Sequence, residues 1–145
     1  MLKTLDLVGS LNLDIEMIAP DHGLIWRGKE ACAHILNRYR ALAEQKPQQR
    51  AVIVYDSMWG STGIMASAIA SGLEDEGVPV RIIDIQKNHH SDVMTELADC
   101  GAVIVGSATH NNNVLPGIAD VLTYMKGLRP QNRVAAAFGS YGWSG

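Results

Sequence analysis

A chain of 145 residues has room for one domain of average size and part of another. Apolar residues make up 47% of it, enough for a buried core, and the net charge of −3 comes from interspersed acidic and basic residues. This pattern excludes a basic surface for nucleic acid or for an anionic membrane. No apolar run reaches the roughly 20 residues of a membrane-spanning helix, and Met1 to Asn12 lacks the pattern of a signal peptide. We therefore expect a cytoplasmic protein that binds neither nucleic acid nor membrane, with Cys32 and Cys100 reduced.

The front of the chain has a pattern of its own. Leu13, Ile15 and Met17 alternate with polar residues, which predicts a half-buried strand, and a turn follows at Pro20 to Gly23. Four apolar residues then recur at helical spacing and predict an amphipathic helix: Ala31, Ile35, Tyr39 and Leu42. The polar stretch from Glu44 to Arg50 contains a proline and is typical of a linker. We expect a domain boundary there.

The rest of the chain alternates between strand and helix patterns. Four short apolar runs predict buried strands of a parallel sheet: Ala51–Tyr55, Val80–Asp84, Ala102–Gly106 and Arg133–Phe138. Helical spacing between them predicts three helices, around Met65–Leu73, Val93–Ala98 and Leu115–Leu122. Ser91 is the expected N-cap of the second helix, and Pro116 suits the first turn of the third. This alternation predicts a doubly wound α/β fold.

The first strand is followed by a loop rich in hydroxyl groups, which opens the first helix of this region. We call Ser57–Thr62 the phosphate loop, and its members are Ser57, Met58, Trp59, Gly60, Ser61 and Thr62. Hydroxyls, a glycine turn and a helix N-terminus with about half a positive charge together suit a phosphate. The loop has neither the lysine of nucleoside triphosphate sites nor a G-x-G-x-x-G pattern, which favours a monophosphate. An ordinary Ser/Gly loop that caps a helix remains the alternative.

Two further loops follow the third and fourth predicted strands. The second loop runs from Ser107 to Asn113, and its candidate binding residues are Ser107, Ala108, Thr109, His110, Asn111 and Asn112. The third loop runs from Gly139 to Gly145, with Ser140, Tyr141, Gly142, Trp143, Ser144 and Gly145 as candidates. Ligands of open α/β sheets bind at the carboxyl ends of parallel strands, a rule for which flavodoxin itself is a standard example. Asn side chains can bond a pyrimidine edge, and Tyr141 and Trp143 can either flank a flavin ring or simply pack. We therefore predict a site for flavin mononucleotide (FMN).

Several runs of residues resemble one known family. YDSMWGST, GSATHNNNVLP, LTYMKGLRP and AFGSYGWSG are similar to the flavodoxin module of flavodiiron proteins, also called A-type flavoproteins or rubredoxin:oxygen oxidoreductases. The segment from Ile18 to Arg27 resembles the end of that family's metallo-β-lactamase-like domain. The resemblance implies that residues 1–27 are the remnant of this domain, 28–49 a helix and linker, and 50–145 an FMN-binding flavodoxin-like domain. It also implies strand order 2-1-3-4, with the fifth strand missing because a helix, a strand and a helix would follow Gly145. Without these elements we expect the fourth strand to be an open edge and part of one sheet face to lose its helical cover.

The resemblance further implies a role in electron transfer. In that family FMN receives electrons from a rubredoxin-like protein or a flavin reductase, and passes them to a di-iron centre that reduces oxygen to water, nitric oxide to nitrous oxide, or both. The flavin of one subunit faces the irons of another in a head-to-tail homodimer. His22 matches the last iron-ligating histidine, and the other ligands are expected upstream of this chain. No residue here is expected to be catalytic, and His89 and His90 are expected to be solvated.

The sequence departs from the family pattern at two positions, and it leaves two alternative functions open. Ala108 and His110 stand where the family has proline and an aliphatic residue, which affects the expected contacts at the ring edge. One alternative is a stand-alone FMN electron carrier, against which the His22 segment argues. The other is a flavin-free fragment that serves only in assembly.

Overall fold

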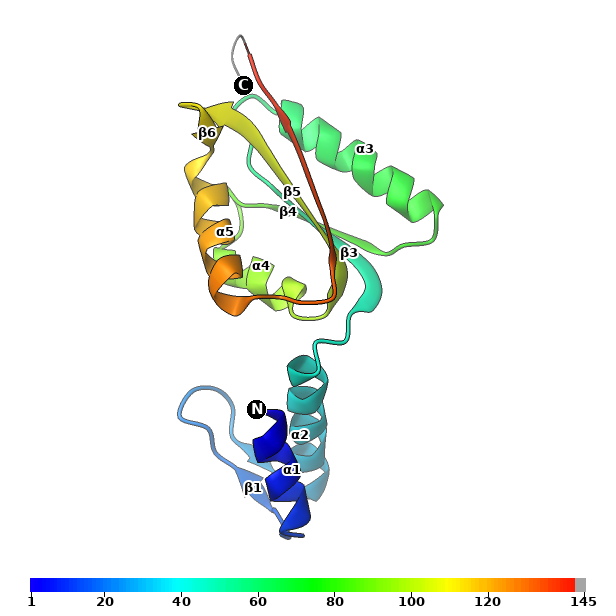
Figure 1. Ribbon diagram of the computed structural model, residues 1–145, viewed down its shortest axis with the longest axis vertical. Coiled ribbons are helices and arrows are strands. Elements are labelled where there is room, and N and C mark those ends of the chain that lie inside the picture. Colours follow the sequence, from blue (N-terminus) through cyan, green and yellow to red (C-terminus); the bar gives the residue numbers. More distant parts are fainter. Residues whose placement is uncertain (143–145) are drawn as a thin grey trace. The chain divides into compact units, whose positions relative to one another are not determined.

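The computed structural model describes residues 1–142 and divides the chain into two compact units between Lys46 and Pro47. The first unit contains α1 (Leu2–Ser10), β1 (Met17–Ile18), β2 (Trp26–Arg27) and α2 (Lys29–Ala43). The second contains β3 (Gln48–Tyr55), α3 (Ser61–Asp75), β4 (Val80–Asp84), α4 (His90–Leu97), β5 (Cys100–His110), β6 (Asn113–Val114), α5 (Pro116–Leu128) and β7 (Val134–Ser140). Figure 1 shows these elements in sequence colours. No helix among the described residues is both long and apolar enough to cross a bilayer.

The first unit is a two-helix and hairpin arrangement with little buried surface. The predicted amphipathic helix is confirmed as α2, whereas α1 was not expected from the sequence. The predicted strand at Leu13 to Met17 is wrong, because only Met17 and Ile18 pair with β2 and the side chain of Leu13 is 60% exposed. The pairing with the β2 side ends at Glu16, whose carbonyl oxygen accepts the Gly28 N–H at 2.7 Å, and β2 pairs with none of the residues 13–15. Cys32 is the one fully buried apolar residue among the described residues of this unit.

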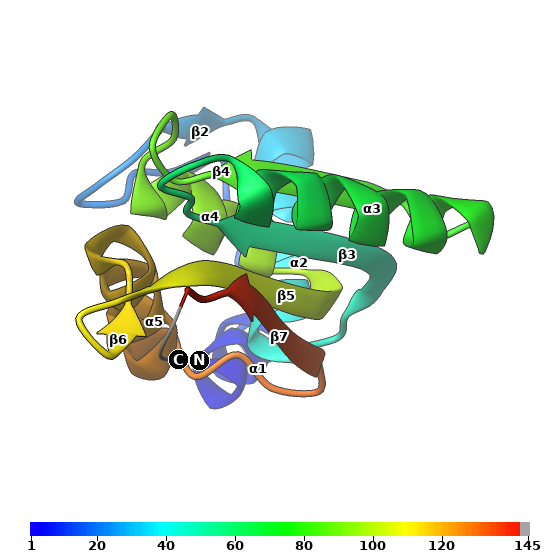
Figure 2. The same cartoon turned by 90° about the horizontal axis from the view of Figure 1, so that it is seen from above.

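The second unit is built on a parallel sheet in the order β4-β3-β5-β7 (Figure 2). When these four main strands are numbered in chain order, the order in the sheet is 2-1-3-4, as predicted. The register aligns Val52 of β3 with Val103 of β5, and Val103 with Ala135 of β7. The short strand β6 pairs antiparallel with the end of β5 and closes a hairpin. Parallel pairing places the carboxyl ends of all four main strands at one edge of the sheet.

Helices cover both faces of this sheet, and each face has its own core. Val52 and Val54 of β3 pack with residues of α4 and α5, including Val93 and Ile118. Ile53 points to the opposite face, where it packs with residues of α3 such as Ala66 and Ala70. Because successive side chains of a strand point to opposite faces, one apolar run in β3 serves both cores. Figure 1 shows α3 on one side of the sheet and α4 and α5 on the other.

Several element boundaries differ from the sequence prediction. β3 begins at Gln48, inside the predicted linker, because Gln48 pairs with Cys100 of β5 and its N–H donates to Asp99 O at 2.7 Å. β5 extends to His110 because its end pairs with both β7 and β6. The N-cap of α4 is His89 instead of Ser91, since the His89 ring accepts the Ser91 N–H and Asp92 accepts the His89 N–H.

The fourth main strand, β7, is more exposed than its apolar sequence predicts. Val134 is 71% exposed, and Ala135, Ala136 and Ala137 are also exposed. An apolar groove of about 620 Å³ runs between β7 and the side chains of α5 such as Leu122. Within residues 1–142, β7 pairs along its length with β5 alone. The interpretation of this run as a strand buried on both faces is therefore wrong, whereas the expected open edge with reduced helical cover on one face agrees with the exposure of β7.

Candidate functional site

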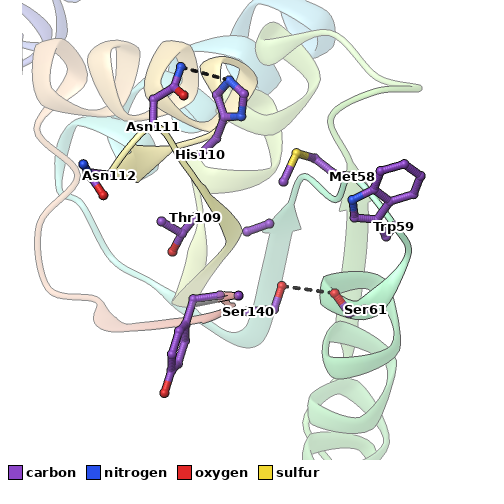
Figure 3. Close-up of a pocket in the computed structure, with 11 residues that line it drawn as sticks. Met58, Trp59, Ser61, Thr109, His110, Asn111, Asn112 and Ser140 are labelled. Atoms are coloured by element: carbon purple, nitrogen blue, oxygen red, sulfur yellow. Dashed lines mark hydrogen bonds between the residues drawn. The ribbon is translucent and has the colours of Figure 1, made fainter. Parts of the chain in front are cut away.

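Three chain segments meet at the carboxyl edge of the sheet and enclose a cavity (Figure 3). The cavity has a volume of about 610 Å³, and its lining comes from the phosphate loop, the end of β5 with its hairpin turn, and the end of β7. The lining residues are Met58, Trp59, Ser61, Ala108, Thr109, His110, Asn111, Asn112, Ser140, Tyr141 and Gly142. A volume of this size suits a cofactor-sized molecule.

The phosphate loop turns sharply into the first turn of α3. Gly60 is the N-cap of α3 and has a φ of 86°, a left-handed conformation that favours glycine. Its N–H donates to Ser57 Oγ at 2.9 Å, which closes the loop on itself. No side chain caps α3, so N–H groups of its first turn remain available for an anion.

Hydroxyl groups from two segments converge where α3 begins. Ser61 Oγ lies 3.1 Å from Ser140 Oγ, and Thr62 Oγ1 lies 3.4 Å from the same atom. Thr62 is fully buried, whereas Ser140 is the last residue of β7. Residues about eighty positions apart in sequence thus present three hydroxyls at one helix N-terminus, and Figure 3 shows the Ser61–Ser140 contact. Such a group of donors suits the oxygens of a phosphate.

The second loop is a tight hairpin, although a loop without strand structure was expected. Asn111 and Asn112 have φ values of 50° and 57°, and they connect His110 to its partner Asn113. Two left-handed residues in succession form the turn that best matches strand twist, and asparagine tolerates this conformation. Ser107 Oγ anchors the base of the loop, because it donates to Ala108 O at 2.8 Å and accepts the Leu115 N–H at 2.9 Å.

Side chains at the rim of the cavity are largely exposed. Trp59 is 91% exposed, Met58 44% and Tyr141 73%. Large apolar side chains in water at a cavity rim are candidates for contact with a flat ligand ring. Trp143 lies outside the described residues, as do Ser144 and Gly145, so their predicted contacts stay predictions.

The remaining predicted residues lie beside or beneath the cavity. Ser57 and Gly60 line an adjoining cleft of about 500 Å³ on the other side of the phosphate loop. Thr62 lies buried below Ser140, and Ser107 lies at the base of the second loop. These four residues therefore shape the walls, and direct contact of each with a ligand remains a prediction.

The described lining of the cavity contains none of the side chains that are ordinarily charged at all pH values near neutrality. Among the described residues that line it there is no Lys, Arg, Asp or Glu. The adjacent buried carboxylate of Asp56, 7% exposed, accepts hydrogen bonds from Ser57 N–H and from Gln86 Nε2. Sequence reasoning missed both Asp56 and Gln86 as parts of the site. The position of Asp56 directly after a buried strand could have marked it as part of the site. Nothing in the sequence marked Gln86, thirty residues away, as its partner.

The two adjacent histidines, His89 and His90, differ in their exposure to solvent, although both were expected to be solvated. His90 is only partly exposed to solvent, because its Nδ1 lies 2.6 Å from Asp120 Oδ2 of α5 and its ring stacks on that of Tyr124 with the ring centroids 4.0 Å apart. His89 is exposed, as expected. His22 lies exposed in the turn between β1 and β2. Among residues 1–142, no group of three or more His, Cys, Asp or Glu side chains is arranged to hold a metal ion.

Comparison with known proteins identifies the family to which this architecture belongs. The sequence profile described as Flavodoxin matches residues 53–145, which include all the loops around the cavity. The chain belongs to the flavodoxin family. Its order of strands and the position of its cavity at the carboxyl edge agree with that membership.

This flavodoxin-family chain is also similar to larger proteins. It is 49% identical to the rubredoxin oxygen:oxidoreductase of Desulfovibrio gigas over 99% of this chain and 36% of that one, with a TM-score of 0.93. It is 43% identical to a nitric oxide reductase of Moorella thermoacetica over 99% of this chain and 35% of that one. The flavodiiron protein of Giardia intestinalis is 32% identical over 99% of this chain and 35% of its own, with a TM-score of 0.89.

These similarities confirm the resemblance to flavodiiron proteins that the motifs indicated. They extend over both compact units, because each covers 99% of the chain. The chain spans about a third of the length of these relatives. The similarity therefore describes one part of such a protein and leaves the activity of the whole to be proposed.

Proposed function

We propose that this chain binds FMN in the cavity between its three loops and serves as the electron-transfer part of a flavodiiron-type protein. The observation that carries the proposal is the uncharged group of hydroxyls from Ser61, Thr62 and Ser140 at the start of α3. This group adjoins a cavity of about 610 Å³ at the carboxyl edge of a flavodoxin-family sheet.

The residues present fit FMN in three respects. The first turn of α3 and the nearby hydroxyls offer hydrogen-bond donors that suit a terminal phosphate, although they include no positively charged side chain. Recognition of the phosphate would therefore depend on hydrogen bonds. The amide groups of Asn111 and Asn112 suit the polar edge of a pyrimidine. Trp59 and Tyr141 suit the faces of a tricyclic ring.

FMN, when bound, would supply reversible one- and two-electron chemistry. This chain's own residues would fix the phosphate, orient the ring and exclude water from part of it. None of the side chains that line the cavity needs to act as nucleophile or general acid. The exposed rim formed by Met58, Trp59 and Tyr141 leaves one side of the site open to a redox partner.

For the whole protein, we propose reduction of oxygen, nitric oxide or both at a di-iron centre held largely by residues outside this chain. The D. gigas relative is named for oxygen and the M. thermoacetica relative for nitric oxide, which supports these substrates. His22 is the proposed iron ligand from this chain, and a rubredoxin-like protein or a flavin reductase is the proposed electron donor. A head-to-tail homodimer would bring the flavin of one subunit to the irons of the next. Residues 1–27 would belong to the metallo-β-lactamase-like domain that carries the irons, and residues 28–49 would link it to the flavin domain.

Flavin selectivity tests the proposal for this chain. Titration of the apoprotein with FMN, riboflavin and FAD, followed by quenching of flavin fluorescence, should give one FMN site per chain. FMN should bind more tightly than riboflavin, because riboflavin lacks the phosphate, and more tightly than FAD, because the phosphate loop has no pyrophosphate pattern. Equal affinity for FMN and riboflavin would reject the phosphate assignment.

A further inference from the structure

One buried carboxylate lies directly behind the phosphate loop. Asp56 is the first residue after β3, and its main-chain N–H donates to Gly106 O of β5 at 3.1 Å. Its Oδ1 accepts the Ser57 N–H at 2.8 Å. Buried carboxylates are costly unless their oxygens are hydrogen-bonded, so these contacts fix the side chain in one orientation.

The second partner of Asp56 comes from the loop between β4 and α4. Gln86 Nε2 lies 2.7 Å from Asp56 Oδ1 and 2.7 Å from Ser57 O. An amide nitrogen carries two hydrogens, so Gln86 donates one to the carboxylate and one to the main chain of the phosphate loop. This pair of bonds defines the peptide orientation at Ser57, whose Oγ in turn accepts the Gly60 N–H.

The backbone that carries Gln86 is itself held in place. The main-chain N–H of Gln86 donates to Asp84 Oδ1 at 3.0 Å, and Asn88 Nδ2 donates to Asp84 O at 2.9 Å. The N–H of Ile85 continues the strand pairing by donating to Tyr55 O at 3.0 Å. The amide of Gln86 therefore projects from an ordered turn and needs little further ordering to hold the phosphate loop.

Asp56 also touches the helix that follows the second loop. A Cβ atom added to Gly117 would lie 3.0 Å from Asp56 Oδ2, so the second carboxylate oxygen packs on the first turn of α5. A negative group at a helix N-terminus is favourable. The carboxylate thus joins the phosphate loop, which lines the cavity, to the β4–α4 loop and to the start of α5.

We propose that Asp56 and Gln86 are positioning residues that hold the phosphate loop in the shape that accepts a phosphate. They do this without touching the ligand, through Ser57 and Gly60. The inference rests on the proposed function, since it concerns selectivity for the phosphate of FMN. Its consequence is that the preference for FMN over riboflavin depends on two side chains outside the cavity wall.

The test compares the ratio of riboflavin to FMN dissociation constants among variants of the full chain. Gln86→Met removes both donors without adding charge, and Gln49→Met makes the same change at an exposed position near the start of β3. Asp56→Ala and Asp56→Asn remove the same charge, but asparagine retains an acceptor for Ser57 and Gln86. Thermal unfolding of each apoprotein reports whether the fold is retained.

We expect Gln86→Met and Asp56→Ala to lower the FMN preference about ten-fold or more, as when hydrogen bonds to a charged group are lost. Riboflavin affinity should change little, and Gln49→Met and Asp56→Asn should keep a wild-type or higher preference. A general loss of packing would weaken both flavins together and would overturn the proposal. If Asp56→Ala does not fold, Gln86→Met decides, because its side chain is exposed on the loop surface.

The two proposals fail in distinguishable ways. Wild-type protein without a preference for FMN would overturn the proposed function and this inference together. Wild-type protein that prefers FMN, with Gln86→Met and Asp56→Ala retaining that preference, would overturn only the positioning role.

Discussion

Thr62 combines complete burial with a polar group that faces the site. Its Oγ1 lies 3.4 Å from Ser140 Oγ, a long contact that a phosphate oxygen would improve upon. Thr62→Val keeps the shape and removes only the hydroxyl. We expect FMN binding to weaken by about 1–3 kcal/mol, as for a lost bond to a charged group, with riboflavin binding unchanged. Isothermal titration of both flavins measures the difference.

The matched control for this change is Thr123→Val. Thr123 is exposed on α5, where its hydroxyl donates to Ala119 O at 2.8 Å within the same helix. The Thr123→Val substitution should leave the affinities for FMN and riboflavin at their wild-type values. Equal weakening of FMN binding by the two variants would show that the Thr62 hydroxyl has no special relation to the phosphate.

Cys100 gives the protein a pH-dependent contribution to stability. Burial raises the pKa of its thiol, against smaller opposing effects of Arg133 and Arg50. The folded state therefore holds the thiol proton more tightly than the unfolded chain does. In the unfolded chain the thiol titrates at about pH 8.5. The contribution is complete below that pH and is lost as the pH rises through the raised folded value.

Urea unfolding at several pH values tests this sign. The free energy of unfolding should fall more steeply with pH, between roughly 8 and 10, for the wild type than for Cys100→Ala. The alanine variant should be less stable at neutral pH because it leaves a small cavity in the core. Parallel curves for the two proteins would contradict the burial effect.

At the scale of elements, the close approach of β5 and β7 positions one wall of the site. A Cβ atom on Gly139 would collide with the main-chain carbonyl oxygen of Ser107, so alanine there must push the strands apart. Gly139→Ala should destabilise the protein by about 1–3 kcal/mol. It should also weaken FMN binding, because the neighbouring Ser140 moves with the strand. Chemical unfolding and flavin titration measure the two effects.

Gly72 provides a control of opposite sign. It lies exposed in α3, and a Cβ atom there meets no other atom within 4 Å. Gly72→Ala should stabilise the protein by roughly 0.5–1 kcal/mol because alanine is the better helix former. If Gly139→Ala were as harmless as Gly72→Ala, the packing of β5 on β7 would be looser than described.

The elements that sequence reasoning identified correctly are those with strong local signals. Val80–Asp84 matches β4 at both ends, and Pro116 begins α5 as its fixed φ predicts. The hairpin turn at Asn111 and Asn112 was missed because the sequence was interpreted as an open loop. The failure at Leu13 to Met17 has the opposite cause. A period-two pattern forms a strand only where it has a partner, and β2 pairs with Met17 but with none of the residues 13–15.

The same distinction between local signals and contacts that depend on the fold applies to the site. Its wall residues could be named from the sequence because they directly follow strands, and parallel pairing brings strand ends together. The contact of Gln86 with Asp56 could not, because the two residues meet only once Tyr55 and Asp84 are in register across β3 and β4. The pairing of His90 with Asp120 likewise depends on how α4 packs on α5.

At the scale of the whole molecule, binding and catalysis are expected to lie in different parts. The described residues hold a cavity that fits FMN but no cluster of His, Cys, Asp or Glu that fits a metal. A di-iron site needs several such ligands converging from different loops. We therefore expect the 145-residue chain by itself to show no oxygen or nitric oxide reductase activity.

Iron analysis and gas consumption test this expectation together. Chemically reduced FMN serves as donor, and free FMN without protein serves as the blank. Consumption of oxygen and nitric oxide should equal the blank, and iron should be substoichiometric. Two irons per chain, or turnover well above the blank, would show that the metal chemistry lies within these residues.

A crystal structure of the protein with FMN would show directly whether the cavity holds the flavin. We expect the phosphate at the start of α3, within hydrogen-bonding distance of the Ser61 and Thr62 hydroxyls. The flavin ring should occupy the cavity between the phosphate loop and the end of β7, with the Asn111–Asn112 turn at its polar edge. A flavin bound instead in the groove between α5 and β7, or one whose phosphate points away from α3, would contradict the account.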